Sequence, residues 1–215
     1  MPLIKADGRL IYFAHVPKCA GTSVARYLEA RGQPMAFSDR RYLSIEAPLR
    51  WTRSSPQHVP LEELERLFPP GFFDASFALV RHPVARIASV YLFQRDKEGT
   101  VPADMRFGDW LSEVEAARAA EPFIYDNHTR PMVEFIPEGA HVFRVEDGLA
   151  PVAAWLEAQL GPAPDAAGIG HHNSRDRLLG AAARPLHVTA QERAIIARIY
   201  AADFERFGYD SALAD

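Results

Sequence analysis

The nine residues HVPKCAGTS (15–23) constrain most strongly what this chain can fold into. They begin at the end of the apolar run LIYFAHV (10–16), which has the length of a buried strand. They precede VARYLEARG (24–32), which has helical apolar spacing and a glycine stop at Gly32. In α/β proteins, a loop between a strand and a helix N-terminus presents backbone N–H groups to an anion, usually phosphate. The sequence therefore predicts an anion-binding loop.

Two further apolar runs, SFALVR (76–81) and HVFRVE (141–146), are also predicted strands. A helical pattern follows each of the three runs, which favours βαβ units and a parallel sheet. The predicted helices, besides residues 24–32, are 61–68, 82–95, 107–120, 150–161 and 189–208; the last has an N-cap at Thr189, a capping-box Glu192 and an end at Gly208. At 215 residues the chain is long enough for one α/β domain and short for two. We expect a single domain over residues 1–215, with a P-loop-like central parallel β-sheet flanked by helices.

Composition excludes several classes of protein. The net charge of −4 gives no support to a general nucleic-acid binder. Cys19 is the only cysteine, so a disulfide framework within the chain is excluded and a reducing compartment is the simpler interpretation. The chain has no apolar run of the roughly 20 residues that a membrane helix takes, and its first residues lack the apolar centre of a signal peptide. We expect a cytoplasmic protein with no membrane or nucleic-acid partner.

The loop itself differs from a Walker A loop, in which a lysine follows the last glycine and is followed by a hydroxyl residue. Here Lys18 precedes Gly21, and Thr22 and Ser23 follow the glycine. The glycine still permits close backbone approach to a phosphate, but no hydroxyl has the lysine-adjacent place that would bind Mg²⁺. This order indicates phosphate binding without a triphosphate–Mg²⁺ apparatus. The alternative is a plain strand–turn–helix with an exposed lysine.

The loop resembles the 5′-phosphosulfate loop of sulfotransferases that use 3′-phosphoadenosine 5′-phosphosulfate (PAPS), specifically the carbohydrate group that contains heparan sulfate 2-O-sulfotransferases. The second signature of that family is an arginine at a strand end and a serine eight residues later, both on the 3′-phosphate. FALVRHPVARIASVY fits it with Arg81 and Ser89, although a surface salt bridge is the alternative for Arg81 alone. The resemblance implies PAPS as cofactor and 3′,5′-ADP as product. The cofactor residues it implies in the loop are Pro17, Lys18, Cys19, Ala20, Gly21, Thr22 and Ser23.

The resemblance spans most of residues 10–210. HVFRVEDGLAPVAAWLEAQLG (141–161) resembles the third strand of the family and the helix after it, and DFERFGYD (203–210) is similar to the aromatic ending of many members. Cys19 stands where threonine is commoner, and His82 stands where aspartate or asparagine usually follows the arginine. Neither position supplies an indispensable side chain in the chemistry described below.

Two polar segments complete the implied site. GIGHHNSRDR (168–177) resembles a late loop that closes over the nucleotide, with Asn173, Ser174 and Arg175 as cofactor-binding candidates. IYDNHTRP (124–131) is similar to an acceptor or cofactor segment of the family. Its candidates are Asn127, Thr129 and Arg130, and for these a helix-capping role is an equal alternative.

Sulfuryl transfer takes few catalytic groups. Lys18 is placed to stabilise the charge that builds on the leaving phosphate, by analogy with phosphoryl transfer. The acceptor hydroxyl must lose a proton, and imidazole is the side chain that accepts one near neutral pH. Among eight histidines we predict His58 as the base, because it lies in a loop between the two cofactor motifs, as the catalytic histidine of the 2-O-sulfotransferase group does. A solvated loop histidine is the alternative, and His128 is the second candidate for the base.

The sequence thus predicts a sulfotransferase that moves a sulfuryl group from PAPS to a hydroxyl acceptor, either a small molecule or a carbohydrate. We expect no metal, because the paired His171 and His172 lack a suitably spaced third ligand. A small-molecule kinase of the P-loop type is the alternative enzyme. A nucleotide-binding module that has lost catalysis on the same fold is the alternative without activity.

Overall fold

The computed structural model describes residues 1–33, 35–162, 168–170 and 186–211. Within these residues the strands form one sheet in the order β1-β2-β3-β4. Their bounds are β1 Leu3–Ala6, β2 Arg9–Ala14, β3 Ala75–Val80 and β4 His141–Arg144. Strands β2, β3 and β4 are parallel to one another, as expected, whereas β1 is antiparallel to β2. The sheet is therefore mixed, and the expectation of a purely parallel sheet is wrong at this edge.

The hairpin between β1 and β2 has a local cause. Ala6 pairs with Arg9, so Asp7 and Gly8 form a two-residue turn, and both have positive φ angles, 47° and 78°. Asp-Gly is a preferred sequence for such turns because their twist matches that of the flanking strands. The sequence carried this hairpin signal, and our prediction did not use it.

The helices lie close to their predicted bounds. They are α1 Gly21–Ala30, α2 Leu61–Leu67, α3 Pro83–Phe93, α4 Phe107–Ala120, α5 Ala150–Leu160, α7 Ala190–Ile199 and α8 Ala201–Phe207. Seven shorter helical segments are described between them: η1 Tyr42–Ser44, η2 Ala47–Leu49, η3 Pro56–His58, the π-helical η4 Gln94–Glu98, η5 Ile124–Asn127, η6 Met132–Glu134 and η7 Val145–Asp147. No described helix combines the length and the hydropathy needed to cross a membrane. The cytoplasmic location and the single domain stay predictions.

The predicted helix 189–208 is two helices. Its capping box at Thr189 and Glu192 is confirmed, and so is its end at Gly208, which has a positive φ angle. The break falls at Tyr200, whose φ of −110° and ψ of 26° are not helical. Tyr200 is fully buried, and its hydroxyl donates to the carbonyl oxygen of Thr129 at 2.8 Å. The break thus coincides with a contact between residues 71 positions apart, which no local sequence pattern predicts.

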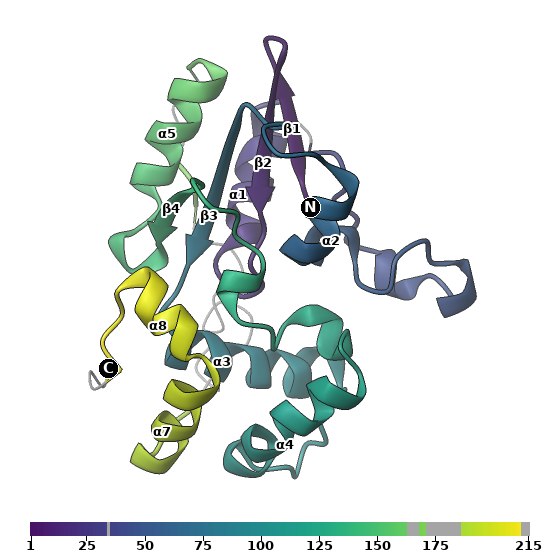
Figure 1. Ribbon diagram of the computed structural model, residues 1–215, viewed down its shortest axis with the longest axis vertical. Helices are drawn as coiled ribbons and strands as arrows, with labels where there is room; N and C mark the ends of the chain where they lie inside the picture. Colours follow the sequence, from purple (N-terminus) through teal and green to yellow (C-terminus); the bar gives the residue numbers. More distant parts are fainter. Residues whose placement is uncertain (34, 163–167, 171–185, 212–215) are drawn as a thin grey trace.

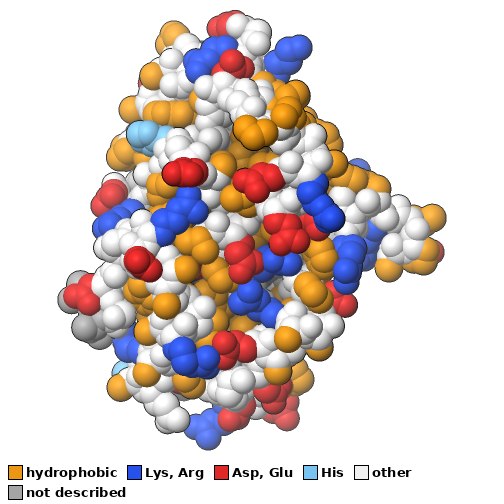
Figure 2. All heavy atoms as spheres, in the orientation of Figure 1, with side chains coloured by type: hydrophobic (Ala, Val, Ile, Leu, Met, Phe, Trp, Pro, Cys, Tyr) orange, Lys and Arg blue, Asp and Glu red, His pale blue; other side chains and the backbone are white. Residues whose placement is uncertain are grey.

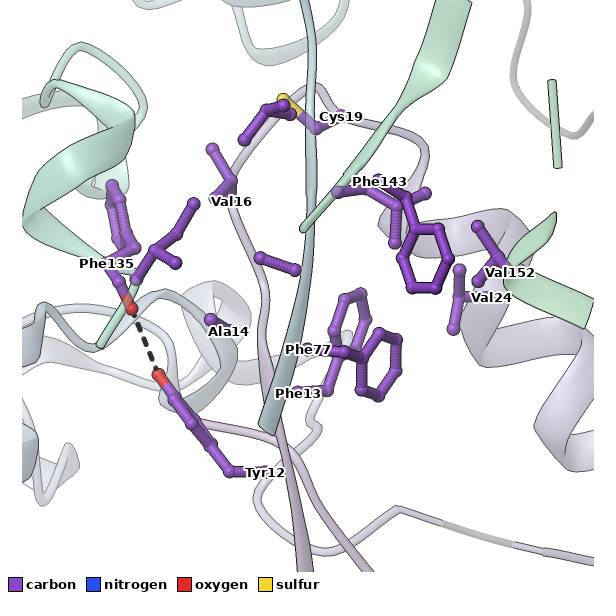
Figure 3. Close-up of a cluster of buried hydrophobic side chains, with 14 of the residues drawn as sticks. Tyr12, Phe13, Ala14, Val16, Cys19, Val24, Phe77, Phe135, Phe143 and Val152 are labelled. Atoms are coloured by element: carbon purple, nitrogen blue, oxygen red, sulfur yellow. Dashed lines mark hydrogen bonds between the residues drawn. The ribbon is translucent and has the colours of Figure 1, made fainter. Parts of the chain in front are cut away.

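Side chains on both faces of the sheet pack into one hydrophobic core. On one face the rings of Phe13 and Phe77 stack with centroids 4.6 Å apart, and Trp155 of α5 packs against Phe77. On the other face lies Tyr12, whose hydroxyl is directed to the carbonyl oxygen of Phe135, so the two rows of side chains leave the strands in opposite directions (Figure 3). This alternation is the two-residue period of a strand.

Helices α3, α4, α7 and α8 form a second layer beyond the carboxyl ends of the parallel strands (Figure 1). They enclose a hydrophobic cluster of their own around the buried side chains of Tyr91, Trp110 and Tyr200. Helix α3 runs beneath β3 in this view, and α8 lies beneath β4. The segments that leave the carboxyl ends of the strands therefore lie between the sheet and this helical layer, where open α/β sheets bind their ligands.

Candidate active site

The loop between β2 and α1 has the backbone of an anion site. Lys18 and Ala20 both have positive φ angles, 67° and 60°, and α1 begins at the next residue, Gly21. The first N–H groups of a helix have no partner within the helix, and they carry its positive dipole end. Gly21 is needed for space, because a Cβ atom there would lie 1.8 Å from Nε2 of His15. The predicted loop thus has left-handed turns before a helix N-terminus, which suits an anion, and its glycine makes room for His15.

Cations converge on this loop. The ammonium of Lys18 lies 3.9 Å from the ring centroid of Phe93, near the end of α3. Burial first, and then the nearby charges of Lys97 and Arg81, lower the pKa of Lys18 to about 8. In the described part of the chain, no carboxylate lies within ion-pair distance of these three cations. An anion bound here would relieve this repulsion.

Arg81 follows β3 directly, and the parallel pairing of β2 with β3 brings it to the same edge as the loop. Two residues later Pro83 begins α3, and Ser89 lies in the second turn of that helix. Both predicted 3′-phosphate residues are partly exposed. Cys19, in contrast, is buried, its Sγ lies 3.9 Å from Sδ of Met132, and burial raises the pKa of its thiol to about 12. Any contribution of Cys19 to an anion site would therefore come from its backbone.

His58 is held by a buried carboxylate that the sequence analysis did not single out. Its Nδ1 lies 2.7 Å from Oδ2 of Asp126, and the exposed fractions of the two side chains are 10% and 8%. Ser55 supports the pair: its backbone N–H donates to Oδ1 of Asp126 at 2.6 Å, and its hydroxyl donates to Oδ2. Burial acts to raise the pKa of Asp126, but the charge and hydrogen bond of His58, together with His128 and Ser55, outweigh it and leave that pKa below its ordinary value.

This pairing fixes the tautomer of His58. An ionised carboxylate can only accept hydrogen bonds, so Nδ1 of His58 must carry the proton in its bond to Asp126. Nε2 then has a free lone pair, which is the form of imidazole that accepts a proton from a substrate. The geometry therefore suits a general base.

Two other imidazole rings flank His58. Its ring centroid lies 5.1 Å from that of His15 and 4.8 Å from that of His128. Burial, and next the charge of His58, lower the pKa of both neighbours, which favours their neutral forms. Nδ1 of His128 lies 3.0 Å from Nε2 of Gln94. His128, the second candidate for the base, has no carboxylate partner of its own in the described residues.

His58, Asp126 and His128 also offer a set of possible metal ligands, with donor atoms within 4.8 Å of one another. Two ligand atoms around a tetrahedral zinc ion are about 3.3 Å apart. The 2.7 Å between His58 and Asp126 is instead the length of a charge-assisted hydrogen bond. The arrangement therefore fits an oriented histidine better than a metal centre.

The segment that carries Asp126 has an uncommon backbone. Tyr125, Asp126 and Asn127 have successive positive φ angles of 54°, 54° and 64°, a conformation that non-glycine residues rarely adopt in series. The Asn127 side chain is fully buried, donates to the carbonyl oxygen of His58 at 2.9 Å and accepts from Nε of Arg130. It therefore ties the segment to the base from a second side.

The side chain of Arg86 on α3 fixes the next residues. It is fully buried and donates to the carbonyl oxygens of His128 at 3.1 Å and Arg130 at 2.7 Å. Thr129 is buried as well, and Arg130 forms an ion pair with Glu134 at 2.7 Å. The described contacts of the three predicted acceptor residues, Asn127, Thr129 and Arg130, thus lie within the protein, and their contact with an acceptor stays a prediction.

A chain of contacts joins the two halves of the site. The ring of His58 packs against that of His128, and the ring of His128 lies 5.3 Å from that of Phe93. The ammonium of Lys18 in turn lies over the face of the Phe93 ring. The candidate base and the anion loop are therefore parts of one site. Of the other predicted residues, Asn173, Ser174 and Arg175 lie outside the described residues, as do His171 and His172.

Asp126 and Ser55 are the residues that sequence reasoning missed. Asp126 lay inside the polar segment IYDNHTRP, which was singled out for its neighbours, and Ser55 precedes His58 by three residues. No spacing pattern relates positions 68 residues apart. Only their buried contacts with each other and with His58 identify them.

A cationic loop at a helix N-terminus, joined to a histidine that a buried carboxylate orients, is the arrangement of an enzyme that transfers an anionic group. Comparison with known families agrees: the sulfotransferase family matches residues 2–146, which include the loop, His58, Arg81 and Asp126. The match covers more than half of the chain, so the chain belongs to the sulfotransferase family, and sulfuryl transfer is the chemistry this supports. No curated protein and no solved structure matches the chain.

Proposed function

We propose that this protein transfers a sulfuryl group from PAPS to a hydroxyl acceptor, in the manner of the carbohydrate group related to heparan sulfate 2-O-sulfotransferases. The observation that carries the proposal is the contact chain from Lys18 through Phe93 and His128 to His58. It brings a cation for the leaving group and a base for the acceptor into one site. Family membership supports sulfuryl transfer, and the cationic loop supports an anionic donor.

The donor would lie with its 5′ end on residues 17–23 and its 3′-phosphate near Arg81 and Ser89. Arg81 and the loop leave adjacent parallel strands, so one nucleotide can reach both. A guanidinium and a hydroxyl are suitable donors to a phosphate dianion. The predicted nucleotide contacts of Asn173, Ser174 and Arg175 are part of the same proposal.

The reaction uses few protein groups. Nε2 of His58 accepts the proton of the acceptor hydroxyl while the oxygen of that hydroxyl forms a bond to sulfur. The bond between sulfur and the 5′-phosphate oxygen breaks, and its electron pair stays on that phosphate, which leaves as 3′,5′-ADP. Lys18 and the backbone N–H groups at the start of α1 stabilise the charge that develops there. Asp126 keeps His58 in the accepting tautomer and stabilises the imidazolium that forms.

A groove between the segments that lead to the base would take the acceptor. It has a volume of about 460 Å³, and its lining includes Trp51 and Arg53 on one side and Phe123 on the other. Along the chain, Arg53 lies two residues before Ser55 and Phe123 lies three residues before Asp126. Because Ser55 donates to Asp126, both sides of the groove continue into the segments that hold the base. The segment around Trp51 projects from the body of the protein and carries apolar and basic side chains (Figures 1 and 2). Aromatic faces and polar groups together suit a hydroxyl-bearing ring such as a sugar.

Incubation with sulfur-labelled PAPS and a panel of sugar and small-molecule alcohols tests the proposal. We expect label to move to an acceptor without added Mg²⁺ and in the presence of a chelator. Calorimetric titration should show that 3′,5′-ADP binds more tightly than 5′-AMP. Equal binding of the two nucleotides, or phosphate transfer from ATP that requires Mg²⁺, would instead favour a kinase. Tight binding of 3′,5′-ADP with no transfer to any acceptor would indicate the non-catalytic module.

A further inference from the structure

The π-helical segment η4, residues 94–98, continues α3 directly and ends at Gly99 in a left-handed conformation. Such short π-helical turns are rare and occur frequently at functional sites. Gln94 anchors this one, since its side chain is buried, contacts His128 and accepts from the hydroxyl of Thr100 at 2.6 Å. The segment therefore lies beside the site at a fixed place.

Lys97 lies on this segment and has no role in the reaction proposed above. Its ammonium lies 4.9 Å from the ring centroid of Phe93, the same ring that the ammonium of Lys18 contacts at 3.9 Å. Lys97 is exposed and makes no ion pair in the described part of the chain, although Asp96 and Glu98 are its neighbours in sequence. Two ammonium groups thus share one aromatic ring.

Like charges at one ring repel each other, and an anion bound between them would turn that repulsion into attraction. The neighbouring Arg95 shows the ordinary alternative, because its guanidinium pairs with Asp96 at 2.6 Å and contacts the hydroxyl of Tyr91. Lys97 instead lies against the same Phe93 ring as Lys18, a residue of the anion loop, and its charge acts on Lys18. Its place therefore points to a ligand with negative charge at the same end of the site.

We propose that Lys97 is a further donor-binding residue, which contacts the phosphosulfate end of the nucleotide from the side of α3. The inference rests on the proposed function. An ammonium is a compact charge with three donors and suits the oxygens of a sulfuryl or phosphate group. Lys18 and Lys97 would then hold the 5′ end of the donor between them, while Arg81 holds its 3′ end.

The test compares two nucleotides by calorimetry, 3′,5′-ADP and adenosine 3′-phosphate, which lacks the 5′-phosphate. Lys97→Met should weaken binding of 3′,5′-ADP roughly tenfold to a hundredfold, the usual worth of a charge-assisted hydrogen bond, and should leave adenosine 3′-phosphate unchanged. Lys97→Arg should keep most of the affinity because it keeps the charge. Arg95→Met removes a charge from the same turn and should change neither affinity.

A second readout reports on Lys18 in the free protein. Lys18 faces the cations Lys97 and Arg81, the carboxylate of Glu98, and the side chains of Cys19 and His128. Removing Lys97 should raise the pH at which Lys18 titrates, followed by NMR of isotopically methylated lysines. A protein whose Lys18 titration does not move has no close contact between the two ammonium groups.

The outcomes separate the two proposals. Wild-type affinity for 3′,5′-ADP in Lys97→Met, or an equal loss for both nucleotides, overturns the role of Lys97 and leaves the proposed function standing. A wild-type protein that binds neither nucleotide refutes the proposed function and this inference with it. Unchanged thermal unfolding of Lys97→Met would confirm that an exposed side chain was removed without damage to the fold.

Discussion

Replacing Asp126 with asparagine tests the base most directly, because it keeps the shape of the side chain and changes what it can accept. The oxygen that remains can still accept from the backbone N–H of Ser55, which lies 2.6 Å from Oδ1 in the wild type. In the wild type, Oδ2 of Asp126 lies 2.7 Å from Nδ1 of His58. In the variant an amide NH₂ would take the place of Oδ2, and this group can only donate to Nδ1. The proton of the imidazole would then move to Nε2, which can no longer accept one from the acceptor.

We expect Asp126→Asn to lower kcat roughly 10²–10⁴-fold, the usual worth of a positioned general base, or about 2.7–5.4 kcal/mol in activation free energy. The affinity for 3′,5′-ADP should stay unchanged, since Asp126 lies on the acceptor side. The assay is transfer of labelled sulfate from PAPS at saturating donor, with calorimetry of 3′,5′-ADP beside it. Glu115→Gln makes the same chemical change at an exposed carboxylate paired with Arg198 and should leave both measurements unchanged.

A kcat near that of the wild type in Asp126→Asn would refute the role of Asp126. A loss in nucleotide affinity equal to the loss in rate would show that the change had damaged the donor site. Stability gives an independent check on the pairing itself. The folded-state pKa of Asp126 lies below its unfolded value, so its stabilising effect is full above about pH 4 and is lost as the pH falls through the folded value. The difference in unfolding free energy between wild type and Asp126→Asn should shrink in acid.

Four other outcomes follow from the donor side of the site. Arg81→Ala should weaken 3′,5′-ADP roughly tenfold to a hundredfold, with little effect on 5′-AMP; equal losses would remove Arg81 from the 3′-phosphate site. Because the pKa of Lys18 is about 8 in the free protein, 3′,5′-ADP affinity should fall as the pH rises above that value, and in Lys18→Met this pH dependence should disappear. Lys18→Met should also lower kcat more than it weakens nucleotide binding, whereas a change in binding alone would make Lys18 only a binding residue. Gly21→Ala should lower the free energy of unfolding by about 1–3 kcal/mol, because the added Cβ meets the ring of His15; an unchanged midpoint of thermal unfolding would contradict the tight contact.

Features with local causes were predictable from the sequence. Helix α4 spans the predicted residues 107–120, because its bounds depend on its own residues and their spacing. The capping box at Thr189 and the left-handed end at Gly208 are likewise short-range patterns. The Asp7-Gly8 turn belongs to the same class, and with it the antiparallel edge strand could have been predicted.

The anion loop is also local, since a strand, a glycine and a helix start within fifteen residues specify it. The cationic surroundings of the loop, in contrast, are not specified locally. Lys97 and Lys18 share the ring of Phe93 only because α3 packs beneath the ends of the strands and continues into η4. A distance of 79 positions along the chain carries no pattern that a sequence could show.

The sequence by itself determined the strands β2 to β4, the helices between them, the loop with Lys18, and His58 as a candidate base. Only the tertiary structure decided what holds His58. Asp126 reaches it through three successive left-handed residues, a backbone that no propensity favours and that the buried contacts of Asn127 and Arg86 keep in place. Local preferences govern single elements, whereas a buried hydrogen bond between residues 58 and 126 is stable only where the whole fold excludes water from it.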